Sequence, residues 1–198
     1  ILDQLPETED EIRKISKFFS YKNYKLFLSK NASESKIKKT DLKNYSYIIF
    51  ATHAIPESET GNSQISGLAL SYPKIVNDLD NGFLNSKEIM NINLNSELVL
   101  LSACETATDN QAAGRAFAGM VNSFFFAGSN SVIASHWKIE SNSTVKITTN
   151  FFKNLIDDEI NTAASLRKSV LDFKKNNKEF NHPGFWGAFS VILNSRQL

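Results

Sequence analysis

The sequence contains a single cysteine, Cys104, and a histidine, His53, about 50 residues before it. A thiolate is a strong nucleophile, and an imidazole can take the thiol proton and later deliver a proton to a leaving amine. His53 follows the apolar run Tyr47–Ala51, and Cys104 comes shortly after the apolar run Leu98–Leu101. These residue types, placed after two such runs, indicate nucleophilic catalysis by a cysteine–histidine pair.

Each residue also has a simpler interpretation. A lone cysteine is usually a small, buried and inert side chain, and a lone histidine after a strand often has only a structural role. Their joint placement favours catalysis, because both end apolar runs and both precede polar loops, 54–67 and 105–111. A long polar loop in a compact domain is often functional.

Continuous apolar runs predict buried strands that are covered on both faces. The predicted strands are Tyr47–Ala51, Leu98–Leu101, Ser131–Ala134 and Phe189–Leu193. Tyr24–Leu28 is a fifth predicted strand, which contains fewer apolar residues.

Helical spacing of apolar residues occurs between these runs. The predicted helices are Thr8–Phe19 with Thr8 and Glu11 as a capping box, a short helix from Ser33, Ala112–Ala127 ending at Gly128, Val145–Ile156, and Ala163–Phe173. Strands alternating with helices predict a mainly parallel sheet with helices on both faces. Ligands bind at the carboxyl ends of such strands, so we expect His53 and Cys104 to approach each other there.

The composition narrows the function classes. Lys and Arg total 22 against 21 for Asp and Glu, so the chain has no charge excess that would favour nucleic acid or an anionic membrane. No apolar run reaches the roughly 20 residues that a membrane-spanning helix needs. The three histidines and one cysteine lack metal-ligand spacing, and we expect neither a metal nor a cofactor. A single cysteine favours a reducing compartment, so we expect a cytoplasmic protein.

Several motifs, in order along the chain, resemble those of the CHAT family, a branch of the caspase- and separase-like cysteine peptidases. They include Leu5-Pro6-Glu7-Thr8, Phe50-Ala51-Thr52-His53-Ala54, Ser66-Gly67-Leu68-Ala69-Leu70, Asn81-Gly82-Phe83-Leu84, Leu100-Leu101-Ser102-Ala103-Cys104-Glu105-Thr106, Phe126-Ala127-Gly128, Val132-Ile133-Ala134-Ser135-His136-Trp137, and His182-Pro183-Gly184-Phe185-Trp186-Gly187-Ala188-Phe189.

The resemblance implies a caspase-like α/β/α sandwich over residues 1–198, forming one domain without its N-terminal part. It implies that Cys104 is the nucleophile and His53 the general base and acid, and that the backbone N–H groups of Ala54 and Cys104 form the oxyanion hole. It also implies a protein or peptide substrate. An activating partner or an N-terminal helical repeat region would regulate cleavage.

Three positions depart from the family pattern. Ala54 and Ala107 stand where glycine is frequent, and a left-handed backbone at Ala54 would strain the oxyanion hole. His136 replaces a residue that is usually apolar, and it offers a rival base at the same sheet edge. His182 belongs to a His-Pro turn, and we expect a structural role for it.

The resemblance also suggests substrate-binding residues. Arg- and Lys-specific relatives carry an acidic residue two positions before the cysteine, where this chain has Ser102. Glu105 could still favour a positively charged substrate, and Trp137 and Lys138 resemble positions that line a peptide groove. Two rival functions remain open: a catalytically inactive scaffold for protein interaction, and an acyl transfer or other hydrolysis that uses the same thiol.

Overall fold

A four-stranded sheet forms the centre of the computed structural model, which describes residues 5–55, 65–102 and 111–195. Its strands lie in the order β1 (Tyr47–Phe50), β5 (Leu98–Leu101), β6 (Ser131–Ser135) and β7 (Phe189–Leu193). The pairs β1–β5 and β5–β6 are parallel, and β7 runs antiparallel to β6. The predicted, mainly parallel sheet is therefore confirmed.

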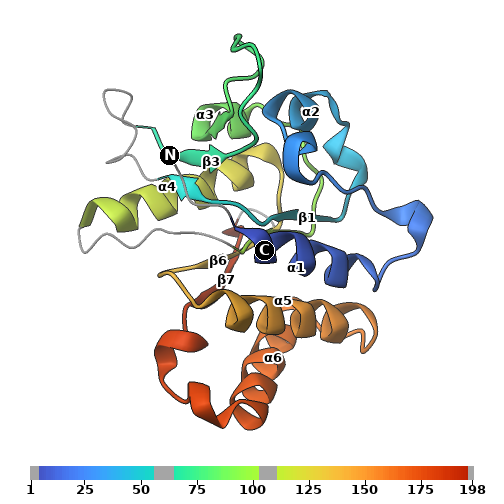
Figure 1. The fold of residues 1–198 in the computed structure, drawn as a ribbon, viewed down its shortest axis with the longest axis vertical. Helices are drawn as coiled ribbons and strands as arrows, with labels where there is room; N and C mark the ends of the chain where they lie inside the picture. The colour runs from blue at the N-terminus through green and yellow to red at the C-terminus, as the bar shows by residue number, and fades with distance from the viewer. Residues whose placement is uncertain (1–4, 56–64, 103–110, 196–198) are drawn as a thin grey trace.

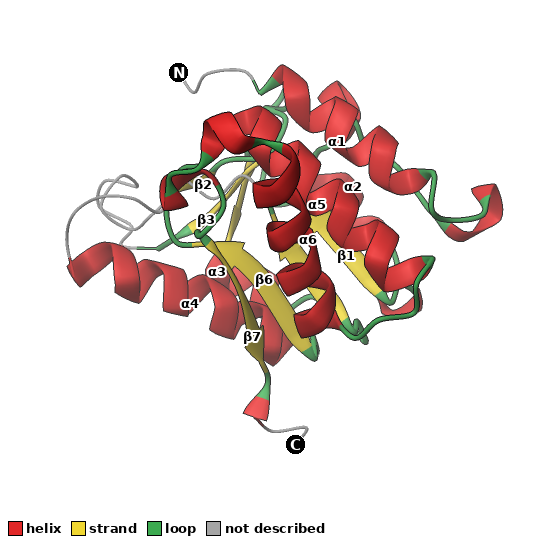
Figure 2. Cartoon of the chain, turned by 90° about the horizontal axis from the view of Figure 1, so that it is seen from below, coloured by secondary structure: helices red, strands yellow, loops and turns green. Residues whose placement is uncertain are grey.

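Helices cover both faces of this sheet (Figure 1). One face carries α1 (Pro6–Ser16), α5 (Ser141–Ile156) and α6 (Thr162–Asn176), and the other carries α2 (Glu34–Lys39), α3 (Ser86–Met90) and α4 (Gln111–Ala127). Seen from the first face, α6 lies in front of β6 (Figure 2). The molecule is thus an α/β/α sandwich.

Strand β5 shows why its sequence is apolar throughout. Leu98 and Leu100 pack against α5 in the core that also contains Phe151. Val99 and Leu101 pack on the opposite face, in the core beneath α4. All four β5 residues are at most 1% exposed. Because successive strand side chains point to opposite faces, a strand between two helical layers needs an apolar residue at every position.

A second, smaller sheet lies beside the end of β1. It contains β2 (Ala54–Ile55), β3 (Gly67–Ala69) and β4 (Phe83–Asn85) in antiparallel order. The predicted loop 54–67 is therefore wrong at its described ends, where Ile55 pairs with Gly67. Strands this short leave almost no periodic signal in a sequence. Residues 56–64 lie outside the described part of the chain.

Polar contacts of fully and partly buried side chains connect α2 to this second sheet and to α3. Glu34 is fully buried and accepts a hydrogen bond from the backbone N–H of Asn81 at 2.8 Å, just before β4. Lys38 contacts the carboxylates of both Glu34 and Glu88, and Glu88 lies on α3. The charges are paired, which offsets the cost of burying them.

Two helix starts differ from their predictions. Helix α1 begins at Pro6, whose missing N–H costs nothing in a first helical turn, and the Thr8 hydroxyl donates to the Leu5 carbonyl at 2.7 Å instead of capping. Helix α5 begins at Ser141 rather than Val145, because the Glu140 carboxylate accepts the N–H groups of the first turn. Because the Thr8 hydroxyl does not cap α1, the predicted capping box of Thr8 and Glu11 is wrong.

The other elements agree with the sequence except in one segment. Ser33 caps α2, α4 ends before Gly128, and α6 spans the predicted helix Ala163–Phe173. The predicted strand Tyr24–Leu28 is wrong: it is extended chain outside both sheets, with its apolar side chains only half-buried. Short 3-10 turns lie at Tyr21–Asn23, Ser29–Asn31, Leu42–Asn44, Lys178–Phe180 and Pro183–Phe185. None of the helices in the described ranges combines the length and apolarity that crossing a membrane requires.

Two glycines near α4 predict opposite effects of the same substitution. Gly128 has φ +112°, and a Cβ there would lie 2.4 Å from the carbonyl oxygen of Leu94, whereas a Cβ at Gly119 would meet nothing within 4 Å. We expect Gly128→Ala to lower the free energy of unfolding by about 2 kcal/mol or more. Gly119→Ala should raise it by about 0.5–1 kcal/mol, because alanine favours the helix. Urea denaturation measures both, and a neutral Gly128→Ala would contradict the steric argument.

Candidate active site

Three strands of the central sheet end at the same edge. The register aligns Phe50 of β1 with Leu101 of β5, and Leu101 with Ala134 of β6. The backbone N–H of Ser102 then continues the ladder by donating to the Phe50 carbonyl at 3.1 Å. Ser102, the residue after β5, therefore lies beside the end of β1 at this edge.

The second sheet fixes the backbone around His53. The His53 carbonyl accepts the N–H of Ala69 at 2.9 Å, and the Thr52 hydroxyl donates to the Ala69 carbonyl. The next residue, Ala54, pairs with Leu68 in β2–β3 and is 5% exposed. Backbone hydrogen bonds on β3 thus hold the histidine in place.

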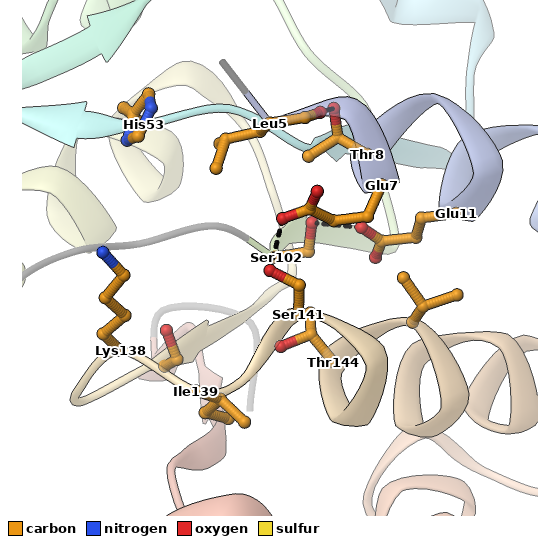
Figure 3. Close-up of a pocket in the computed structure, with 12 residues that line it drawn as sticks. Leu5, Glu7, Thr8, Glu11, His53, Ser102, Lys138, Ile139, Ser141 and Thr144 are labelled. Atoms are coloured by element: carbon orange, nitrogen blue, oxygen red, sulfur yellow. Dashed lines mark hydrogen bonds between the residues drawn. The ribbon is translucent and has the colours of Figure 1, made fainter. Parts of the chain in front are cut away.

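A pocket with a volume of about 60 Å³ lies at this edge, between the carboxyl ends of the strands and the N-terminal turns of α1 and α5. His53, Ser102 and Lys138 line it together with residues of both helices (Figure 3). The structure therefore brings these three sequence-predicted residues to one pocket. Cys104, Glu105 and Ala107 lie outside the described residues, so the predicted nucleophile follows Ser102 by two positions in sequence only.

Trp137 and the other two histidines have contacts elsewhere. The indole N–H of Trp137 donates to the Gly184 carbonyl at 3.1 Å, and the side chain does not line the pocket. His136 Nε2 lies 2.9 Å from the Ser190 hydroxyl on β7, also away from the pocket. His182 Nδ1 accepts the Gly184 N–H at 3.0 Å within its own turn.

The backbone at Ala54 does not require glycine. Among the described residues, only Ser29 and Glu159 combine a side chain with positive φ, and Ala54 lies in an ordinary strand. Alanine therefore occupies this position without the strain of a left-handed backbone, which the resemblance to the family had suggested.

Glu11, which the sequence suggested as a capping residue, reaches the site from α1. Its side chain is 1% exposed, and its Oε2 accepts a hydrogen bond of 3.0 Å from the Ser102 hydroxyl. A sequence signal for this role exists: Glu11 lies four positions before Ile15, on the buried stripe of the helix. A carboxyl group on an apolar stripe is uncommon and points to a specific partner.

Burial sets the acidity of Glu11. It raises the pKa of this carboxyl from its ordinary value of 4.5 to about 7, although the nearby hydroxyls of Thr148 and Ser102 oppose the rise. The other oxygen, Oε1, is buried and accepts no hydrogen bond from the described residues. The carboxyl group therefore changes charge near neutral pH while it contacts Ser102.

Glu7 makes a second contact between α1 and the pocket. It lies one turn before Glu11, and it accepts a hydrogen bond from the Ser141 hydroxyl in the first turn of α5 (Figure 3). Two carboxyl groups of α1 thus face the pocket and contact different elements. Within the described ranges, no cluster of His, Cys, Asp and Glu has the arrangement of a metal site.

The raised pKa of Glu11 predicts how stability depends on pH. The folded protein binds this proton more tightly than the unfolded chain does, so the contribution of Glu11 to stability is greatest below pH 4.5 and falls as the pH rises to about 7. The loss amounts to about 3 kcal/mol. Glu11→Gln should remove this dependence, as urea denaturation at several pH values will show.

Glu9→Gln provides the matched control, because Glu9 lies on the same helix but pairs with Arg13 at a half-exposed site. It should retain the pH dependence of the wild type. A constant difference between wild type and Glu11→Gln across this pH range would contradict the assignment.

Comparison with known proteins identifies the family. The family model of the CHAT domain matches residues 1–194. None of the curated proteins matches the chain. CHAT domains are caspase-like, and the α/β/α sandwich with a mostly parallel sheet agrees with that fold. The match covers nearly the whole sequence, and the chain therefore belongs to the CHAT domain family.

Proposed function

We propose that the protein is a caspase-like cysteine endopeptidase that cleaves an extended segment of a protein substrate. The observation that carries the proposal is that His53 and Ser102 line the same pocket. Ser102 lies two residues before Cys104 in the sequence. The parallel register of β1 and β5 explains how residues so distant in sequence serve one site. We expect the protein to act in the cytoplasm.

The chemistry follows from these two side chains. His53 takes the proton of the Cys104 thiol, and the thiolate attacks the carbonyl carbon of the scissile peptide bond. The N–H groups of Ala54 and Cys104 stabilise the negative charge that develops on the carbonyl oxygen. His53 then protonates the departing amine, and water hydrolyses the thioester to release the acid and the thiol.

Substrate contacts belong to the same proposal. Ser102 and Lys138 line the pocket, which supports the proposal that they contact the residue before the scissile bond. Glu105 remains a proposed contact, whereas Trp137 would act only as part of the wall formed with the 183–187 turn. An activating partner or a helical repeat region would control access, as in the family.

A peptide carrying a thiol-directed electrophile tests the proposal. We expect it to label Cys104 and to inhibit cleavage, because the thiol provides the covalent step. Cys104→Ala should abolish labelling and peptide cleavage, and His53→Ala should lower kcat by roughly 10²- to 10⁴-fold. Mass spectrometry and single-turnover kinetics measure these effects.

His136→Ala is the matched control, because this histidine lies at the same sheet edge but contacts Ser190 instead of the pocket. It should retain cleavage. Turnover by Cys104→Ala would exclude the proposed nucleophile, and a loss confined to His136→Ala would identify the rival base. No labelling and no cleavage in the presence of activating partners would favour the scaffold function.

A further inference from the structure

A buried carboxyl group contacts the residue that directly follows β5 and lies two positions before Cys104 in sequence. Glu11 Oε2 accepts the Ser102 hydroxyl at 3.0 Å, across a separation of 91 positions in the chain. Both side chains are buried, at 1% and 4% exposure. Ser102 is the last described residue before the segment that carries Cys104.

Two hydroxyl groups, those of Ser102 and of Thr148 on α5, stabilise the ionised form of Glu11. Oε1 is buried and accepts no hydrogen bond from the described residues. A helix-stabilising role would direct the carboxylate to the first turn of α1, but the first-turn hydroxyl of Thr8 donates to Leu5 instead. The hydrogen bond with Ser102 is the contact through which Glu11 reaches the end of β5.

We propose that Glu11 is a positioning residue for Cys104, because its carboxylate holds Ser102 at the end of β5 and thereby fixes the start of the nucleophile segment. This inference rests on the proposed function. Hydrogen bonds to a charged acceptor are shorter and roughly twice as strong as those between neutral groups. The ionised carboxylate therefore holds Ser102 more firmly than the protonated acid does, and Ser102 keeps its own proton in both states.

Burial raises the pKa of Glu11 to about 7. The strength of the hydrogen bond between Glu11 and Ser102 therefore depends on pH near neutrality. Among the described residues, the other titratable or charged groups around the pocket are Glu7 on α1, His53 after β1 and Lys138 after β6. The residues that α5 contributes to the pocket, among them Ser141 and Thr144, are uncharged. A comparison of Glu11→Gln with the wild type leaves all these groups in place.

A double-mutant cycle tests the proposal. We expect Glu11→Gln to lower kcat for a peptide substrate roughly tenfold at pH 8, with KM nearly unchanged. Ser102→Ala should lower kcat to a similar extent, and the double variant should lose no more kcat than either alone. The effect of Glu11→Gln should shrink below twofold at pH 5.5, where the wild-type carboxyl is itself protonated. Ser102→Thr keeps the hydroxyl and should restore most of the rate.

Alkylation of the single cysteine by iodoacetamide provides a readout that needs no peptidase activity. Its rate in Glu11→Gln and Ser102→Ala should change to the same extent and without additivity, whereas the surface variant Glu9→Gln should match the wild type. If alkylation shows this coupling but no peptide is cleaved, the proposed function fails and the positioning role stands. Additive effects in the cycle, or identical pH profiles for Glu11→Gln and the wild type, would overturn the positioning role.

Discussion

The parallel pairing of β1, β5 and β6 determines the geometry of the whole site. Parallel strands deliver their carboxyl ends to one edge, and the register of Phe50, Leu101 and Ala134 brings the chain after each strand to that edge. This pairing is stable because both faces of the sheet are covered by helices, so every β5 side chain is buried. The two-sided core therefore supports the fold and places His53 and Ser102 on a common pocket.

The N-terminal helix α1 contacts both the apolar core and the polar residues of the pocket. Helix α1 packs on α5 through its apolar side, including Ile15, yet it also buries Glu11 against Ser102 and joins Glu7 to Ser141. An ionised carboxylate in such surroundings costs folding free energy, which is why a purely structural element would carry an apolar residue there. The ionised form of Glu11 thus lowers stability, and the residue lines the pocket.

The sequence predicted the features that depend on continuous or periodic apolar residues. The strands β1, β5, β6 and β7 and the helix ended by Gly128 belong to this class, because burial leaves a direct pattern. Strands β2 and β3 could not be predicted, because backbone hydrogen bonds, such as that from the Ala69 N–H to the His53 carbonyl, hold them together. Such bonds leave no pattern in the sequence. Glu11 was misassigned because a carboxyl group three residues after Thr8 fits a capping box, whereas the observed helix begins at Pro6, so that Glu11 is its sixth residue and is buried. The position of Cys104 relative to His53 stays a prediction.

The two tryptophans of the chain lie at one corner of the molecule. Trp137 donates to Gly184, and the ring of Trp186 carries the ammonium group of Lys174 at 4.0 Å from its centroid. Both indoles thus contact or belong to the turn that precedes β7. Intrinsic fluorescence of this protein consequently reports the environment of that turn and of the junction between β6 and β7, and it is a local optical probe of the corner next to the pocket rather than an average over the fold.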